Sequence, residues 1–358
     1  MTSKLTRADL EALPAYIPGR SPADLARELG LPEAIKLASN EVPYGPLPGV
    51  VDAITAAASG SHRYPDMGVV ELREALAARY DVPTDRIATG CGSVALAEHL
   101  ARATCLPGDE IVYSWRSFEA YPIISATTAA TSVRVPNTPD HGHDLAAMAA
   151  AITDRTRLVL VCNPNNPTGT TVRRTELDRF LAAVPDDVVV VLDEAYREFV
   201  TDPDVPDGLT AYGERPNVVV LRTMSKAWGL AGLRVGFLVA QPEVAAAVRK
   251  VVTPFSTNAV GQAAALAALK QAEEVRRRCA LVVSERERVT EEVRRLVPDV
   301  PSSQANFVWL PLGDRSAAFG VACEKQGVIV RPFQGDGVRV TIGTPPENDA
   351  FLAAAATF

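Results

Sequence analysis

Cysteine is scarce in this sequence, and its few positions are scattered. The chain has 358 residues but only five cysteines, an odd number with no CxxC spacing. A framework of disulfide bonds and a cysteine-ligated zinc site are both disfavoured, because each needs paired or regularly spaced cysteines. This usage fits a protein of the reducing cytoplasm.

Long apolar runs and long basic runs are also lacking. The first 16 residues have no apolar stretch of the kind found in signal peptides, and no later run approaches the length that spans a membrane. No basic run exceeds the three arginines at 276–278, and the formal net charge is −7. We therefore expect a cytoplasmic protein that binds neither a membrane nor a nucleic acid.

The length favours two domains, because 358 residues exceed the usual size of a single hydrophobic core. Residues 1–45 are rich in proline and glycine and are interpreted as an N-terminal arm that forms part of the small domain. Residues 46–245 alternate helical patterns with short apolar runs and predict the large domain. Residues 246–358 predict a smaller α+β domain.

Short apolar runs in residues 46–245 predict the strands of a sheet. Continuous apolar strands that alternate with helices are typical of a mostly parallel sheet covered on both faces, so the predicted class is α/β with a three-layer α/β/α large domain. The small domain is expected to begin with helical patterns at Glu243–Val252 and Asn258–Leu296. The expected strands of the large domain are Arg86–Thr89, Glu110–Tyr113, Ser132–Val135, Leu158–Cys162, Val188–Leu192, Val218–Leu221 and Val235–Val239.

Chemically active groups follow four of these strands, at the end of the sheet where open parallel sheets bind ligands. Gly90–Ser93 follows the first strand, Asn163–Gly169 the fourth, Asp193–Tyr196 the fifth and Arg222–Lys226 the sixth. The set combines a glycine turn that approaches an anion, an amide, a carboxylate beside a phenol, and a lysine. Together these groups suit pyridoxal phosphate.

Lys226 is the candidate for covalent chemistry. Small and apolar residues flank it, and loss of solvation shifts a lysine toward the neutral amine that condenses with a carbonyl. The ordinary alternative is a solvated lysine on a loop. Thr223, Ser225 and Arg234 place anion-binding groups beside the amine and favour the functional interpretation.

Asp193 and the glycine turn each leave two interpretations open. Asp193 ends a run of five apolar residues, where its carboxylate can keep the ring nitrogen of pyridoxal phosphate protonated, or it can cap a helix. The backbone of Gly90–Ser93 can bind an anion or merely join a strand to a helix. This turn is not the GxGxxG of nicotinamide-dependent oxidoreductases, which disfavours that class.

Three motifs carry a resemblance to a known family. The segments NNPTG at 165–169, DEAY at 193–196 and SKAWGLAGLRVG at 225–236, in this order, resemble the fold-type I aminotransferases that depend on pyridoxal phosphate. Within that group the chain is most similar to the histidinol-phosphate aminotransferase family. Trp115–Glu119, with Phe118 where the family more often has tyrosine, and Ser303–Gly313 are closer to its actinobacterial branch of aromatic (phenylalanine) aminotransferases.

The resemblance implies roles for individual residues. Lys226 holds the cofactor and moves protons, Asp193 pairs with the pyridine nitrogen, and Tyr196 acts at the 3′ oxygen. It also implies a homodimer, in which Tyr64 reaches the phosphate in the other subunit. The further cofactor-binding residues are Gly92, Ser93, Phe118, Asn166, Thr223, Ser225 and Arg234.

Arg339 is the implied ligand of the substrate carboxylate. Strand alternation places it on the face opposite its apolar neighbours, where it meets either a substrate or solvent. Tyr16, Asn40 and Trp115 are further substrate-binding candidates, and an aromatic substrate would need such an apolar pocket. Arg331 would suit a phosphate-bearing substrate but is compatible with both branches of the family.

The preferred function is transfer of the amino group of phenylalanine, tyrosine or tryptophan to 2-oxoglutarate, which gives glutamate. Histidinol-phosphate transamination is the alternative, and a decarboxylase dependent on pyridoxal phosphate remains possible because it would use the same cofactor residues. No metal is expected. His141 and His143 are interpreted as part of a solvated turn before a helix cap.

Overall fold

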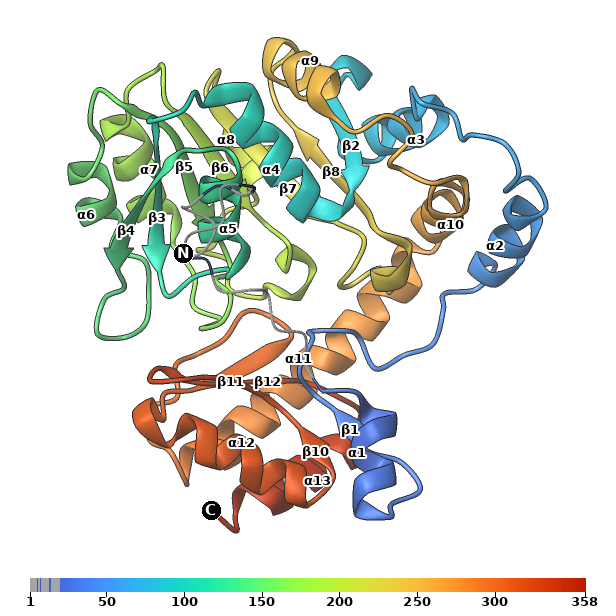
Figure 1. Ribbon diagram of the computed structural model, residues 1–358, viewed down its shortest axis with the longest axis vertical. Helices are drawn as coiled ribbons and strands as arrows, with labels where there is room; N and C mark the ends of the chain where they lie inside the picture. The colour runs from blue at the N-terminus through green and yellow to red at the C-terminus, as the bar shows by residue number, and fades with distance from the viewer. Residues whose placement is uncertain (1–4, 6, 8–12, 14–19) are drawn as a thin grey trace.

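The computed structural model describes residues 5, 7, 13 and 20–358, so Tyr16 lies outside the described residues. Its central feature is a seven-stranded sheet of order β2-β8-β7-β6-β5-β3-β4 (Figure 1). All seven predicted runs belong to this sheet. The strands are β2 (Ile87–Cys91), β3 (Glu110–Trp115), β4 (Thr131–Pro136), β5 (Thr156–Cys162), β6 (Val189–Asp193), β7 (Val218–Thr223) and β8 (Val235–Val239).

The mostly parallel pairing is confirmed, and β8 accounts for the exceptions. Strands β3, β4, β5, β6 and β7 pair in parallel, whereas β8 pairs antiparallel with both β2 and β7. The connection from β7 to β8 spans residues 224–234 and contains only a short 3₁₀ turn, Ala231–Leu233. An antiparallel neighbour needs no crossover helix, so this short connection reverses the chain beside β7.

Helices cover both faces of the sheet, as predicted for three layers. Along β5, Leu158 and Leu160 pack toward α4 and α5, whereas Val159 and Val161 pack toward α7 on the opposite face. This division follows the two-residue period of a strand. One face carries α4 (Gly92–Thr104), α5 (Ala120–Thr127) and α9 (Pro242–Val251), and the other α6 (Leu145–Ala150), α7 (Arg174–Ala183) and α8 (Gly208–Tyr212).

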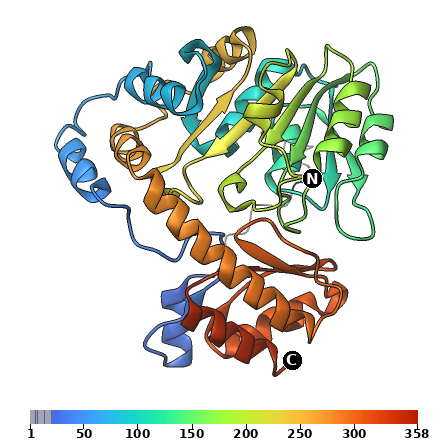
Figure 2. The ribbon, with the colours of Figure 1, turned by 180° about the vertical axis from the view of Figure 1, so that it is seen from behind.

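The predicted single helical pattern at Asn258–Leu296 is wrong. The chain instead forms α10 (Ala259–Leu269) and α11 (Ala272–Arg294), with a break at Lys270 and Gln271. The break lets α10 pack near α2 (Val50–Ala58) and α3 (Val70–Tyr80) while α11 takes its own course. Figures 1 and 2 show α11 running from the large sheet to the smaller sheet described next.

A second sheet of three antiparallel strands lies beyond α11. Its order is β11 (Arg331–Phe333), β12 (Gly337–Thr341) and β9 (Phe307–Leu310). Strand β10 (Val328–Ile329) precedes β11 in the chain but lies outside this sheet. The helices that pack in this part of the structure are α12 (Ser316–Lys325) and α13 (Pro345–Ala355). Elsewhere in the chain, short 3₁₀ turns lie at Thr84–Arg86 and Arg197–Phe199, and a further one lies at Gly313–Arg315 before α12.

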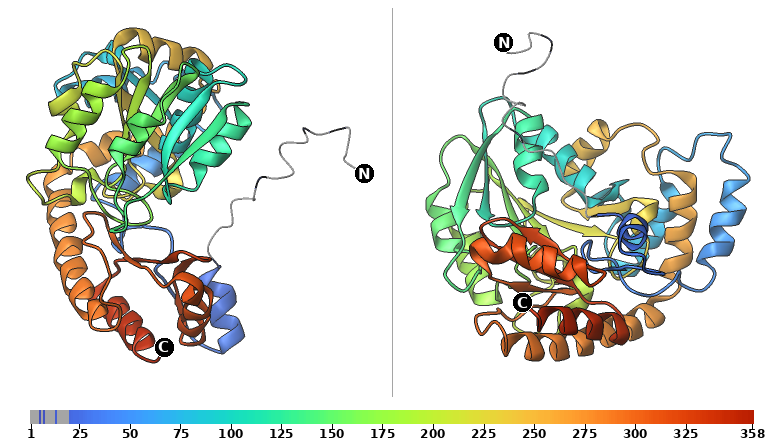
Figure 3. Two further views of the ribbon diagram at one scale, coloured as in Figure 1. Left: turned by 90° about the vertical axis from the view of Figure 1, so that its left-hand side faces the viewer. Right: turned by 60° about the horizontal axis from the view of Figure 1, so that its bottom comes forward.

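The N-terminal segment joins this C-terminal part of the chain. Strand β1 (Ile35–Lys36) pairs in parallel with β10, and α1 (Pro22–Leu29) lies beside the C-terminal helices (Figure 3). After β1 the chain reaches Asn40, which contacts both Tyr196, after β6, and Thr341 of β12, so residues 37–40 lie between the seven-stranded and the three-stranded sheets.

The domain boundaries at 45 and 245 stay predictions. Among the described residues, no helix is both long and apolar enough to cross a membrane.

Candidate active site

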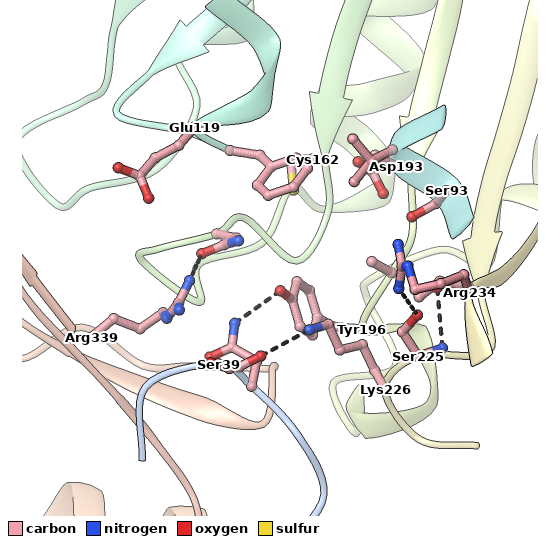
Figure 4. A pocket seen from close by; sticks show the side chains of 16 residues that line it. Ser39, Ser93, Glu119, Cys162, Asp193, Tyr196, Ser225, Lys226, Arg234 and Arg339 are labelled. Atoms are coloured by element: carbon pink, nitrogen blue, oxygen red, sulfur yellow. Dashed lines mark hydrogen bonds between the residues drawn. The ribbon is translucent and has the colours of Figure 1, made fainter. Parts of the chain in front are cut away.

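A pocket lies at the carboxyl ends of β5, β6 and β7, where the sequence predicted the site (Figure 4). Segments from both sheets and from the N-terminal part of the chain line it. Residues far apart in the sequence thus share one cavity. The predicted residues that line it are Asn40, Ser93, Phe118, Asn166, Asp193, Tyr196, Thr223, Ser225, Lys226, Arg234 and Arg339.

Lys226 lies on the pocket wall, in the connection that follows β7. Its neighbours Met224 and Trp228 are buried, which anchors this connection against the core. Lys226 Nζ donates a 3.1 Å hydrogen bond to the carbonyl of Ser39. Burial, and after it the positive charge of Arg339, lower the pKa of Lys226 to about 7. A substantial share of this amine is therefore neutral near neutral pH.

Asp193 is the last residue of β6 and is buried. Its Oδ2 accepts a 2.8 Å hydrogen bond from the Tyr121 hydroxyl, while Oδ1 has no hydrogen-bond partner among the described residues. Burial raises the pKa of Asp193 and outweighs the opposing hydrogen bonds from the Tyr121 hydroxyl and the Ala195 amide, so the pKa is about 6. The helix-cap interpretation is wrong, because the next helical turn begins at Arg197 with Tyr196 as its cap.

One end of the pocket is built to bind an anion. Arg234 Nη1 donates to Ser225 Oγ at 3.2 Å, and Figure 4 shows both side chains near Ser93. Ser93 lies in the first turn of α4, whose N-terminus has no side-chain cap to occupy its N–H groups. Gly92 has φ +79°, and a Cβ there would lie 2.4 Å from Arg234 Nη2. Glycine at this position thus lets the guanidinium approach the helix N-terminus.

Arg339 lies at the opposite end, as Figure 4 shows. Its guanidinium donates to Asn166 Oδ1 and to the Ala38 carbonyl, each at 2.6 Å, and its side chain is buried. The solvent alternative is therefore wrong. Strand alternation points Arg339 at the large sheet instead, because β12 faces the pocket.

Asn40 and Tyr196 form a second contact between the two sheets. Asn40 Nδ2 donates to the Tyr196 hydroxyl at 2.9 Å, and Asn40 Oδ1 accepts from Thr341 Oγ1 at 3.0 Å. Burial raises the pKa of Tyr196, so its hydroxyl stays protonated. Asn40 thus orients the Tyr196 phenol. The sequence predicted Asn40 as a substrate-binding residue and did not predict this contact.

Several predicted residues do not line the pocket. Tyr64 is exposed and stacks on Phe255 with ring centroids 4.5 Å apart. The Trp115 ring lies 4.6 Å from the guanidinium of Arg116, and that of Arg134 lies at the same distance. Arg331 forms an ion pair with Glu119. Gly92 does not line the pocket itself, but its lack of a side chain leaves room for Arg234, which does.

Ser39, Glu119 and Tyr121 are functional-site residues that the sequence reasoning missed. Ser39 and Glu119 line the pocket, and Tyr121 bonds Asp193 from behind. The Tyr121 ring contacts the Phe118 ring, with centroids 5.6 Å apart, although Phe118 lies before α5. No local signal marks Glu119, because its partner is 212 residues away.

The histidine segment is only partly as predicted. Asp144 caps α6 by accepting a hydrogen bond from the Ala147 amide at 2.9 Å. His143 is half-buried rather than fully solvated: its Nε2 lies 2.8 Å from the Cys162 carbonyl, and burial lowers the pKa of His143 to about 4. Among the described residues, no group of three or more histidine, cysteine or acidic side chains is arranged to hold a metal. All five cysteines are free.

Comparison with known proteins identifies the class. Residues 32–355 match the family described as aminotransferase class I and II, and the chain belongs to that family. The aromatic amino acid aminotransferase of Streptomyces coelicolor is 57% identical over 357 residues, which cover 100% of this chain and 98% of that protein. The protein of the same name from Rhodococcus jostii is 56% identical over 350 residues, 98% and 95% of the two chains.

The fold agrees with a solved structure. The histidinol-phosphate aminotransferase of Sinorhizobium meliloti, in complex with pyridoxal-5′-phosphate, is 28% identical and has a TM-score of 0.86. The match covers 99% of this chain and 97% of that one. The predicted family and fold-type I class are thus confirmed.

Proposed function

We propose that this protein is an aromatic amino acid aminotransferase that depends on pyridoxal phosphate. It transfers the amino group of phenylalanine, tyrosine or tryptophan to 2-oxoglutarate and yields glutamate. One observation carries the proposal: an amine with a lowered pKa and a buried carboxylate line one pocket between an anion-binding end and Arg339.

The residues fit each part of the cofactor. Ser93, Ser225 and Arg234 supply the donors that a phosphate needs. Asp193 Oδ1 is buried and has no hydrogen-bond partner among the described residues, a place that a protonated ring nitrogen would fill. Pyridoxal phosphate supplies, when bound, a conjugated ring that draws electrons from the amino acid Cα.

The side chains of this pocket divide the chemical work. Lys226 Nζ, as a neutral amine, would hold the cofactor through its aldehyde and, once the substrate amine has released it, would be the base that takes and returns the Cα proton. Asp193 would keep a positive charge on the ring nitrogen, and Tyr121 holds that carboxylate in place. Tyr196 and Asn166 would hold the cofactor oxygen beside the aldehyde by hydrogen bonds.

The aromatic preference is supported by relatives and by charge. Full-length relatives at 53–57% identity carry the name aromatic amino acid aminotransferase. Arg331, the residue that would suit a phosphate-bearing substrate, is occupied by Glu119 at 3.0 Å. Phe118 presents an apolar ring to the pocket. Histidinol phosphate is the second candidate, because the neighbour from S. meliloti carries that name at 28% identity.

The homodimer belongs to the same proposal. Tyr64 does not line the pocket of its own chain, and its side chain is 82% exposed. Val51, Met67 and Val70 are also exposed apolar residues in the same part of the sequence. A second copy that buried these side chains would agree with the proposed role of Tyr64 at the partner's phosphate site. Analytical ultracentrifugation should show a dimer.

The cytoplasmic location stays a prediction, which the free thiols of all five cysteines support.

The experiment compares amino donors in single turnovers. Phenylalanine, tyrosine and histidinol phosphate are mixed separately with the loaded protein, and conversion of the cofactor to its amine form is followed by absorbance. Phenylalanine should react with the highest kcat/KM, and 2-oxoglutarate should reverse the change. A preference for histidinol phosphate would contradict the aromatic assignment, and stoichiometric release of carbon dioxide would indicate a decarboxylase.

A further inference from the structure

Glu119 occupies an unusual place at the pocket. It immediately precedes α5, but its carboxylate makes no capping hydrogen bond to that helix. The side chain instead reaches across to β11, where Glu119 Oε2 accepts a 3.0 Å hydrogen bond from Arg331 Nη2. Local helix chemistry therefore does not account for its position.

Arg331 is paired in register with Arg339 across β11 and β12. Directly opposed residues in antiparallel strands project from the same face, so the two arginine side chains leave the sheet on one side. The Phe333 ring lies 5.5 Å from the Arg331 guanidinium and 5.7 Å from that of Arg339, which partly offsets their repulsion. An anion that reached both groups would be bound far more tightly than one that reached Arg339 alone.

Glu119 stands between the cavity and Arg331. Glu119 lines the pocket at the same end as Arg339, as Figure 4 shows, whereas Arg331 does not line it. The side chains of the pair are only 29% and 16% exposed, so water screens their charges weakly. The pocket wall near Arg339 therefore presents the Glu119 carboxylate, and Arg331 lies behind it.

We infer that Glu119 sets the preference of this site for aromatic over anionic side chains, by occupying Arg331 and repelling a second anion. The inference rests on the proposed function and extends it to substrate choice. An aromatic side chain needs no counter-charge, so the Glu119–Arg331 pair costs it no binding free energy. A distal anion must instead displace Glu119 from Arg331, which costs binding free energy. This cost falls on histidinol phosphate and also on glutamate and 2-oxoglutarate, so these bind more weakly than they would without Glu119 but are not excluded.

The two ends of the pair have opposite expected effects. Glu119→Gln removes the repulsion and releases Arg331 to the cavity, so the affinity for a distal anion should rise. Arg331→Gln leaves the carboxylate of Glu119 uncompensated, so the same affinity should fall. A merely structural ion pair would shift both variants in one direction.

Binding of two unreactive analogues to the loaded protein tests the inference. Glutarate carries two carboxylates and 3-phenylpropionate carries one beside an aromatic ring. By isothermal titration calorimetry, Glu119→Gln should increase the affinity for glutarate relative to 3-phenylpropionate by about tenfold, and Arg331→Gln should decrease it by a similar factor. The ratio of kcat/KM for glutamate and phenylalanine should move in the same two directions.

The chain offers a matched control. Glu98 pairs with Arg102 at 2.6 Å, and its side chain is 30% exposed, close to the 29% of Glu119. Glu98→Gln removes an ion pair outside the pocket and should leave the affinity ratio within twofold of the wild type.

The outcomes separate this inference from the proposed function. A glutarate ratio in Glu119→Gln within twofold of the wild type, or a shift of both variants in one direction, overturns the inference. If Glu119→Gln does not fold, Arg331→Gln decides, because an unchanged or increased glutarate affinity is then the contrary result. Binding of both analogues without transamination of phenylalanine contradicts the proposed function and leaves the affinity ratios to decide the role of Glu119.

Discussion

The Tyr121 hydroxyl donates a 2.8 Å hydrogen bond to Asp193 Oδ2, and both side chains are buried. The bond ties α5 to the end of β6, so the layer that covers the sheet also fixes the carboxylate. Asp193 Oδ1 remains available to a cationic group in the pocket. Oδ2 thus holds the carboxylate in position, and Oδ1 is left to bind the cationic group.

Removal of the Tyr121 hydroxyl tests this division. Tyr121→Phe should lower the free energy of unfolding by about 1–3 kcal/mol, because it leaves a buried carboxylate oxygen without its donor. Urea unfolding of the cofactor-free protein measures the effect. Tyr113→Phe is the control: Tyr113 is equally buried but bonds Ser132 Oγ at 2.9 Å and should cost less, because that acceptor is a neutral hydroxyl. An equal loss in the two variants would argue against a special bond to Asp193.

Substitution of the lysine tests the central residue. Lys226→Ala should abolish turnover and the absorbance of cofactor held through this side chain, because no other lysine in the described part of the chain lines the pocket. Stopped-flow absorbance with phenylalanine measures both effects. Retained activity would rule out the proposed mechanism.

Asp193 is expected to matter for rate more than for cofactor binding. Asp193→Asn keeps the shape of the side chain but cannot hold a positive charge on the ring nitrogen, so kcat should fall by about 100-fold or more. The phosphate donors are untouched, and the cofactor should still bind. A rate like that of the wild type would mean that another group maintains the ring charge.

The lowered pKa of Lys226 makes the stability of the cofactor-free protein depend on pH. Below its folded pKa of about 7, the native state must hold a charged amine in a poorly solvated place, a cost that the unfolded chain does not bear. This cost declines as pH rises from about 7 toward the ordinary lysine pKa of 10.5, because both states then lose the proton. Lys226→Met should therefore unfold at higher urea concentration than the wild type at pH 6. The difference should shrink by pH 9, and a constant difference would contradict the lowered pKa.

The buried ion pair beside the site is expected to support stability. Arg222 Nη2 lies 2.6 Å from Glu194 Oε2, and both side chains are almost fully buried. Glu194→Gln should lower the free energy of unfolding by about 3 kcal/mol, because it leaves the Arg222 charge less compensated. Glu98→Gln, whose partner Arg102 is 51% exposed, should cost less than about 1 kcal/mol in the same urea titration. Equal losses would mean that Asp207, 2.9 Å from Arg222, compensates fully.

Local sequence patterns predicted the large sheet and the placement of its chemistry. The apolar runs inside the sheet become strands because a buried strand needs apolar residues on both faces, whereas β4, at the edge, is only partly buried. Asp193 and Lys226 reach one pocket because the groups that follow neighbouring parallel strands emerge at one edge. The hydrophobic pattern of the strands and the order of residues along the chain were sufficient to predict the large sheet and the edge at which its active groups lie.

Tertiary packing alone decided the contacts between distant segments. Asn40 bonds Tyr196 across 156 residues, and Glu119 bonds Arg331 across 212. No local pattern encodes such pairs, because they depend on how the smaller sheet sits against the larger one. The same reason explains Arg339: strand alternation gave its face, but only the neighbouring sheet decided that this face meets a pocket rather than water.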